Sequence, residues 1–322
     1  MRVVVTGASG FLGSWICRIL SESHQVFAIM REDSDGFRVK DIEKLKTSKI
    51  CPTSWRGAIS EFEPDVIVAC HWSGVGNQDR NSPNQFDNLN LMIELANYAT
   101  KSKLSAFIAL GSQAELGPVP GPILENMADN PTTVYGEAKV RVRSELERIF
   151  LNSPTRFLWA RIFSTYGPLD SDSWLIPSVI SKLLKDEKVE LTPGTQRWSF
   201  LHAIDAAFAI QKVINEESIS GIVHLGNPTT LEVRDAVNYI ANQLDKISLL
   251  EFGAIPFRDD QVVSMMPVCT KLESVSWSPQ VNFEEGVSEL ISWMRGSNTF
   301  SWTDNHLNRK SISIPARPQI HK

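Results

Sequence analysis

Tyr135 and Lys139, two residues with acid–base chemistry, are four positions apart in a stretch of helical character over residues 133–150. Residues at i and i+4 of a helix share one face, and a nearby ammonium favours the phenolate form of a tyrosine. Such a tyrosine can deliver or remove the proton of a carbinol oxygen while a hydride moves. An isolated pair of this kind is more often a surface pair, so its meaning depends on the rest of the chain.

Ser112 supplies a second polar group. It follows the apolar run of residues 104–110, which is typical of a buried strand, so it lies at the end of that strand. Its hydroxyl can hydrogen-bond the same carbinol oxygen. We therefore expect Ser112, Tyr135 and Lys139 to be catalytic residues of a hydride-transfer site.

A glycine-rich turn at the start of the chain indicates what supplies the hydride. The β-branched run of residues 3–5 predicts a buried strand and residues 15–20 have the spacing of an amphipathic helix; Thr6-Gly7-Ala8-Ser9-Gly10-Phe11-Leu12-Gly13 lies between them. In this context Gly7 permits the sharp turn, Gly10 the close approach of a pyrophosphate and Gly13 the packing of helix on strand. Free N–H groups at the helix start then face two phosphates. The expected cofactor-binding residues here are Gly7, Ser9, Gly10, Phe11, Leu12 and Gly13.

Two further positions bear on the cofactor. Arg31 follows the predicted strand of residues 25–30, where an acidic side chain suits a ribose hydroxyl and a basic one a 2′-phosphate. Arg31 favours NADP(H) over NAD(H), unless it is a solvated loop residue and Glu32 or Asp33 takes the ribose. His71, after the predicted strand of residues 65–70, either touches cofactor or substrate or is a packed loop residue.

The alternation of strands and helices predicts an α/β fold, a doubly wound parallel (Rossmann) sheet with a smaller C-terminal α/β substrate lobe. Residues 1–165 are the expected dinucleotide-binding domain, with residues 196–228 returning to it, and 166–295 the substrate-binding lobe. Residues 296–322 form a polar C-terminal extension. The remaining expected elements are helices 85–101, 174–184, 205–215, 231–244 and 283–294, and strands 156–162, 188–191, 222–225 and, weakly, Lys49-Ile50-Cys51.

Composition excludes several classes of protein. The 322 residues carry a net charge of −5 without a basic run, which argues against a nucleic-acid partner. Cys17, Cys51, Cys70 and Cys269 are widely spaced and form no metal-ligand pattern, so no metal and a thiol-keeping cytoplasm are expected. No apolar run reaches the length of a membrane span, and the chain starts with a core strand rather than a signal peptide.

Taken together, these motifs resemble the extended short-chain dehydrogenase/reductase family, the nucleotide-sugar epimerases, dehydratases and reductases, over residues 1–295. The glycine turn matches the family's TGxxGxxG, and Tyr135-Gly136-Glu137-Ala138-Lys139 matches its YxxxK, with Ser112 as the third catalytic position. Residues 161–168 resemble its R-x-x-N-x-Y-G-P segment, with Ser164 in place of asparagine. Gln196-Arg197 resembles the segment in which an arginine binds the nucleotide diphosphate.

The resemblance implies a substrate and, by one departure, a reaction. In the family's 4,6-dehydratases Asp and Glu follow the catalytic Thr, whereas Gln113-Ala114 follow Ser112 here, which argues against a dehydratase. The stretch is most like reductases of CDP- or dTDP-4-keto-6-deoxyhexoses, with NADPH as hydride source and Tyr135 as proton donor. The alternatives are an epimerase with tightly bound NAD and a non-catalytic cofactor-binding regulatory protein.

The resemblance also implies ligand contacts and an assembly. Gln113 and Ser164 are expected on the substrate, and Arg197 and Arg258 on its phosphates, although Arg258 equally suits a surface pair with Asp259 or Asp260. Helices 85–101 and 133–150 correspond to the family's dimerisation pair, so a homodimer is expected.

Overall fold

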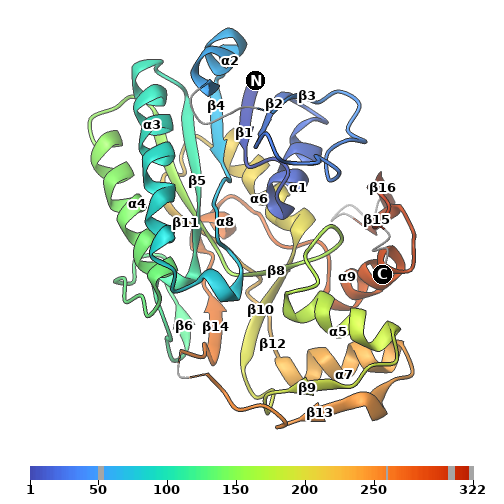
Figure 1. Cartoon of the computed structure of the whole chain (residues 1–322). Helices are drawn as coiled ribbons and strands as arrows, with labels where there is room; N and C mark the ends of the chain where they lie inside the picture. The colour runs from blue at the N-terminus through green and yellow to red at the C-terminus, as the bar shows by residue number, and fades with distance from the viewer. Residues whose placement is uncertain (50–53, 259, 304–308, 319–322) are drawn as a thin grey trace.

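A seven-stranded, fully parallel sheet forms the body of the protein (Figure 1). The structure is a computed structural model, and it describes residues 1–49, 54–258, 260–303 and 309–318. The strand order is β11 (Gly221–Leu225), β7 (Arg156–Ile162), β5 (Ala106–Ser112), β4 (Val66–Ala69), β1 (Arg2–Thr6), β2 (Gln25–Met30) and β3 (Lys46–Lys49). The order reverses direction beside β1, as a doubly wound sheet requires, so the predicted fold class is confirmed.

Helices cover both faces of this sheet (Figure 1). One face carries α1 (Phe11–Leu20) and α6 (Ala203–Asn215), and the other carries α2 (Trp55–Phe62), α3 (Asn88–Lys101) and α4 (Val134–Phe150). Side chains of β1 alternate between the two layers: Val3 and Val5 belong to the apolar cluster of α1, and Val4 to that of α3. Burial on both faces explains why this strand is an unbroken β-branched run.

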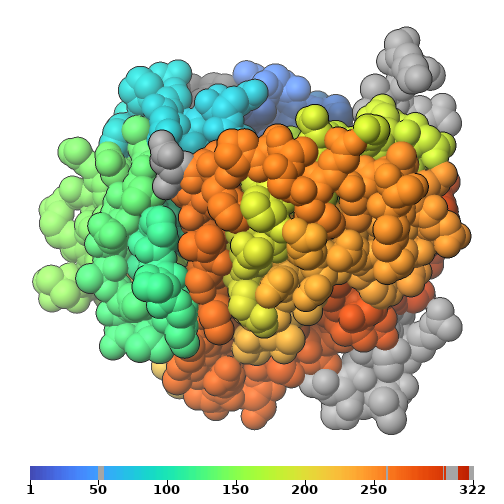
Figure 2. Space-filling view, turned by 90° about the horizontal axis from the view of Figure 1, so that it is seen from below, coloured from blue at the N-terminus to red at the C-terminus, as the bar shows by residue number. Residues whose placement is uncertain are grey.

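A smaller sheet lies at the end of the molecule drawn lowest in Figure 1 and seen from below in Figure 2. Its order is β12 (Thr230–Glu232), β10 (Arg197–His202), β14 (Ser264–Pro267) and β6 (Pro122–Ile123), with β8 (Ser164–Tyr166) also beside β10. Beside it lie α5 (Leu175–Leu184), α7 (Val233–Gln243) and the pair β9 (Val189–Leu191) and β13 (Leu250–Phe252). This is the predicted C-terminal α/β lobe, joined by the early strand β6.

Several predicted boundaries coincide with the observed elements. Residues 25–30 and 156–162 are β2 and β7, and residues 283–294 are α9 (Phe283–Met294), which follows the short α8 (Thr270–Ser274). The weak strand predicted at Lys49-Ile50-Cys51 begins earlier, at Lys46, and Ile50 and Cys51 lie outside the described residues. Within the segment 196–228, α6 and β11 belong to the main body, whereas β10 belongs to the second sheet.

The C-terminal extension packs onto the body. It contains an antiparallel hairpin, β15 (Thr299–Thr303) with β16 (Arg309–Ser313). Beyond the hairpin, Ile314 is buried, and the carbonyl of Pro315 accepts a 2.9 Å hydrogen bond from the Trp293 indole. In the part of the chain that the structure describes, none of the helices has the length and apolar character needed to span a bilayer.

Candidate active site

A cavity of about 770 Å³ lies at the carboxyl ends of the main-sheet strands. Its wall starts at the glycine turn after β1, passes Cys70, Ser112 and Ile162 at the ends of β4, β5 and β7, and continues into the second lobe along α5 and β9. Ligands of open α/β sheets bind at this edge. One continuous cavity therefore spans the cofactor end and the C-terminal lobe.

The glycine turn is shaped for a dinucleotide. Gly7 has a φ of +66°, and a Cβ there would lie 2.6 Å from the backbone nitrogen of His71. A Cβ on Gly13 would lie 2.3 Å from the Gly7 carbonyl oxygen. Gly10 is the N-cap of α1 and caps it with no side chain, so the first N–H groups of the helix are open to a ligand. Because these glycines carry no side chains, a pyrophosphate can approach the backbone closely. The turn therefore fits the pyrophosphate of a dinucleotide.

Not all of the expected cofactor residues line the cavity. Gly7, Gly10, Phe11, Leu12 and Gly13 do. The Ser9 side chain is not in the wall; its carbonyl instead accepts a 3.1 Å hydrogen bond from Arg38.

Ser112, Tyr135 and Lys139 all line the cavity. The β5 strand ends at Ser112, and α4 places Tyr135 in its first turn, where Thr133 caps the helix through a 3.1 Å bond from the N–H of Gly136. A side-chain hydrogen bond joins Ser112 to the Tyr135 phenol. Burial raises the pKa of this phenol, and the charge of Glu115 adds to the rise, whereas Ser112 and the charge of Arg80 oppose it.

Lys139 is buried beneath the tyrosine. Its Nζ donates a 2.7 Å hydrogen bond to the Leu110 carbonyl and lies 3.6 Å from the centroid of the Trp72 ring. Burial lowers the pKa of Lys139 to about 7, although the charge of Glu115 pulls it upward. Trp72 also meets Tyr135 edge to face, with ring centroids 5.8 Å apart. The indole thus fixes both the lysine and the tyrosine.

Glu115 anchors the serine end of the site. Its carboxylate is fully buried and accepts hydrogen bonds from the Ser112 N–H at 2.6 Å, the Trp159 indole at 3.0 Å and the Arg161 guanidinium at 3.0 Å. Ser112 in return accepts from the N–H of Ala114, which closes a capping box. A buried carboxylate held this way keeps the end of β5 in one geometry. Glu115 is not among the site residues expected from the sequence.

Three of the four expected substrate residues lie in the cavity wall. Gln113, Ser164 and Arg258 line the cavity, and the Gln113 amide oxygen is buried without a hydrogen-bond partner among the described residues. Arg258 also forms a 3.2 Å ion pair with Asp260, which was the alternative for it; its contact with the phosphates stays a prediction.

The structure does not place Arg197 where its predicted contact with the substrate phosphates requires it. Along β10 its neighbours Gln196 and Trp198 line the cavity, whereas Arg197 is exposed outside the cavity wall and donates to Thr230. Successive side chains of a strand point to opposite faces. Arg197 therefore lies on the face of β10 opposite to its two neighbours and points away from the cavity in which phosphate binding was expected.

Arg31 and His71 also lie outside the cavity wall. Arg31 is exposed and forms a 3.4 Å ion pair with Asp33, the solvated arrangement that was the alternative for it. The His71 Nδ1 bonds the Thr6 hydroxyl at 2.8 Å, and burial lowers the pKa of this imidazole to about 4, so it is a neutral residue that packs behind the glycine turn. Arg38, in contrast, lines the cavity beside the glycine turn, where it bridges the carbonyls of Ser9 and Leu169.

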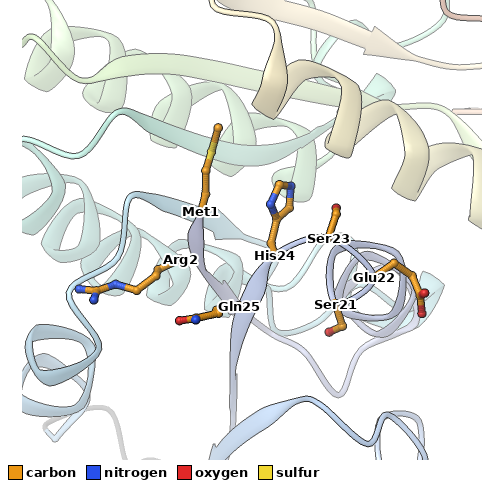
Figure 3. A pocket seen from close by; sticks show the side chains of 7 residues that line it. All are labelled: Met1, Arg2, Ser21, Glu22, Ser23, His24 and Gln25. Atoms are coloured by element: carbon orange, nitrogen blue, oxygen red, sulfur yellow. The ribbon is translucent and has the colours of Figure 1, made fainter.

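A second, shallower cavity of about 530 Å³ lies at the opposite edge of the sheet (Figure 3). Its side chains come from the amino ends of β1 and β2 and from the turn after α1, and include Arg2, Glu22 and His24. They do not converge on one point in Figure 3, and no cluster of metal-ligating side chains occurs among the residues described. The cavity at the carboxyl edge is therefore the candidate active site.

A glycine-turn dinucleotide cradle beside a Ser–Tyr–Lys constellation defines an NAD(P)-dependent oxidoreductase of the extended short-chain dehydrogenase/reductase type. The sequence model of the "NAD dependent epimerase/dehydratase family" matches residues 3–226, and the chain belongs to that family. The proposed resemblance is thus confirmed.

Individual relatives are distant. The chain is 26% identical over 152 residues to the CDP-abequose synthase of Salmonella muenchen, a match that covers 46% of this chain and 52% of that protein. It is 22% identical to the dTDP-D-glucose 4,6-dehydratase of Mus musculus over 94% of this chain and 90% of that protein. The structure of UDP-N-acetylglucosamine 4-epimerase from Methanobrevibacter ruminantium M1 superposes with a TM-score of 0.83 at 20% identity, covering 91% and 98% of the two chains.

Proposed function

We propose that the protein reduces the 4-keto group of a nucleotide-activated (CDP- or dTDP-) 4-keto-6-deoxyhexose, with NADPH as the hydride donor. The observation that carries this proposal is the continuous cavity, which sets Ser112, Tyr135 and Lys139 between a dinucleotide cradle and a second lobe large enough for a nucleotide sugar. The similarity to a CDP-abequose synthase supports a deoxysugar nucleotide as substrate.

The residues after Ser112 argue against dehydration. The resemblance places two carboxylates directly after the catalytic hydroxyl in dehydratases, and this chain has Gln113 and Ala114 there. Glu115 does not replace them, because its carboxylate is fully buried and held by Ser112, Trp159 and Arg161 rather than in the cavity. The site thus has a proton donor for the keto oxygen but lacks a carboxylate acid–base pair beside Ser112.

Each residue of the constellation has its own task in this reaction. The cofactor, when bound at the glycine turn, supplies the hydride. The Ser112 hydroxyl orients the keto oxygen, and the Tyr135 phenol gives it a proton as the alcohol forms. Lys139, fixed by Leu110 and Trp72, holds the cofactor side of the site and returns a proton toward the phenolate. Gln113, Ser164 and Arg258 line the substrate side, with Arg258 available for a phosphate.

A preference for NADP(H) over NAD(H) rests on Arg38 rather than Arg31. Arg38 lines the cavity next to the glycine turn, and its planar guanidinium suits a phosphate. Arg31, exposed and paired with Asp33, serves as the matched control.

The test combines binding and turnover. Equilibrium binding of NADPH and NADH is measured for wild type, Arg38→Met and Arg31→Met; we expect tighter NADPH binding that Arg38→Met alone removes. Consumption of NADPH is then followed with CDP- and dTDP-4-keto-6-deoxyhexoses. Tyr135→Phe should lower kcat by at least about 100-fold with unchanged cofactor binding. Retained turnover in that variant, or tightly bound NAD with no net NADPH consumption, would contradict the proposal; the second result indicates an epimerase.

A further inference from the structure

The loop between β4 and α3 is hydrogen-bonded to the first turn of α4. The Tyr135 N–H donates a 2.8 Å hydrogen bond to the Arg80 carbonyl, and the Val134 N–H donates to the Asn81 side chain. Gln85, almost fully buried, ties the loop together: its amide donates to the Gly74 and Asp79 carbonyls at 2.6 and 2.9 Å. Because these bonds fix the loop, its side chains hold a defined position around the phenol.

Arg80 packs against the tyrosine from this loop. Its guanidinium carbon lies 5.7 Å from the centroid of the Tyr135 ring, within the range of a cation–π contact. The side chain is half-buried and lines the cavity, and within the described part of the chain its Nε has no hydrogen-bond partner. Among the described residues, the guanidinium therefore lies against the tyrosine ring and keeps an Nε that donates no hydrogen bond.

Within the described part of the chain, the charged or titratable groups that face the phenol can be named. Ser112 bonds the phenol oxygen, Glu115 raises its pKa, and Arg80 lowers it. The Lys139 Nζ lies 5.8 Å from the same ring centroid but sits on the Trp72 face, and its own pKa falls to about 7. An arginine stays charged at every working pH. Arg80 itself has Arg258 and Asp260 as its charged neighbours.

We propose that Arg80 is a positioning residue that acts through Tyr135: its guanidinium stabilises the phenolate left when the tyrosine gives its proton to the substrate oxygen. The cation that the sequence predicts for this task is Lys139, four residues along the helix. The geometry points instead to two cations with different contacts: Lys139 lies against the Trp72 ring, and Arg80 lies against the Tyr135 ring. This inference rests on the proposed function only in taking Tyr135 as the proton donor.

The first test needs no substrate. The four tyrosines of the chain are replaced biosynthetically by 3-fluorotyrosine, and their ionisation is followed by ¹⁹F NMR; Tyr135→Phe identifies the resonance of position 135. We expect Arg80→Met to raise the titration midpoint of that resonance by about one pH unit, the usual effect of losing one close opposite charge. Arg80→Lys should give a smaller rise.

Arg38→Met is the matched control, because Arg38 is also a half-buried arginine of the cavity wall but bonds Ser9 and Leu169 instead of the tyrosine. It should leave the midpoint unchanged. The other three resonances report whether each variant is folded. An unchanged midpoint in folded Arg80→Met and Arg80→Lys overturns the inference.

Turnover separates this role from substrate binding. If Arg80 acts through the phenol, the alkaline limb of the kcat–pH profile moves by the same unit as the NMR midpoint. A higher KM with an unmoved profile would make Arg80 a substrate-binding residue and contradict the inference. A shifted midpoint in a protein that does not reduce keto sugars would refute the proposed function and leave the role of Arg80 standing.

Discussion

At the scale of single residues, Asp170 is a further group of the cavity wall whose pKa is shifted. One oxygen of its carboxylate accepts from the Ser171 N–H at 2.8 Å, and the other is buried without a partner among the described residues. Burial raises the pKa of Asp170 to about 8, against the opposing effects of the Ser171 bond and the Arg38 charge. A carboxyl that is largely neutral near pH 7 does not repel an anionic ligand, which suits a wall that a dinucleotide and a nucleotide sugar would share.

This raised pKa predicts how stability depends on pH. The folded protein keeps the Asp170 proton up to about pH 8, whereas the unfolded chain loses it near the ordinary value of 3.8. Between these values the folded state binds more protons, so the contribution of Asp170 to stability is full below pH 4 and is lost as pH rises toward 8. In urea unfolding from pH 5 to pH 9, Asp170→Asn should gain stability relative to wild type as pH rises. Curves that stay parallel across this range would refute the assignment.

At the scale of elements, the site depends on a close contact between α4 and the end of β5. Gly136, next to Tyr135, approaches the segment after Ser112 so closely that a Cβ would lie 2.3 Å from the Ala114 carbonyl oxygen. That neighbour is backbone, so helix or strand end must move to admit a side chain. The distance between the tyrosine and the serine is therefore set by a glycine that takes no part in the chemistry.

Gly136→Ala should accordingly lose both stability and turnover. Overpacking of this kind costs about 1–3 kcal/mol of unfolding free energy, and kcat should fall because Tyr135 and Ser112 separate, while cofactor affinity, set at the glycine turn, stays. Gly57→Ala is the control, since this helical glycine has no atom within 4 Å of its absent Cβ; it should gain about 0.5–1 kcal/mol. Equal stability and kcat in Gly136→Ala and wild type would show that the contact does not position the site.

At the scale of the whole molecule, the sequence predicts the main sheet and the helices of the second lobe well, and the short strands of the second sheet poorly. Buried strands such as β2 and β7 are long apolar runs with clear ends, so their bounds follow from the residues alone. Strands β6, β8, β12 and β14 have two to four residues and no strand-like run, and they form only because distant segments pair.

The same physical limit applies to the active site. Tyr135, Lys139 and the glycine turn are local patterns, and the structure brings them to one cavity. Arg80, Arg38 and Arg161 reach their partners through long-range contacts, for example the bond from Arg161 to Glu115 across 46 positions of the chain, and no local spacing reveals them. Glu115 differs, because Ser112-Gln113-Ala114-Glu115 has the local spacing of a capping box. Arg197 shows a different limit. Its segment has a recognisable motif, but a shift of one residue decides which face of a strand a side chain occupies.

Arg18 is one of the residues that join the C-terminal extension, which the sequence leaves unexplained, to the body. Its guanidinium is buried and makes a two-pronged pair with Asp41 at 2.8 and 2.9 Å. It also donates to the Arg38 carbonyl at 3.0 Å and to the Ser313 carbonyl at 2.9 Å. One side chain of α1 thus ties the extension to the turn that presents Arg38 to the cavity.

Replacing this arginine should therefore weaken stability and the extension together. Arg18→Met leaves the Asp41 carboxylate and two carbonyls without their donor. Because the Asp41 side chain is 23% exposed, the cost should stay below the value of about 3–5 kcal/mol for breaking a fully buried pair. Hydrogen exchange should speed up at Ile314, whose N–H bonds the Asn298 carbonyl behind the hairpin. Arg148→Met, which breaks only the exposed pair with Glu145, should cost at most about 1 kcal/mol. If both variants unfold at the same urea concentration, the extension is held by the apolar contacts of Ile314 and Trp293 and not by this arginine.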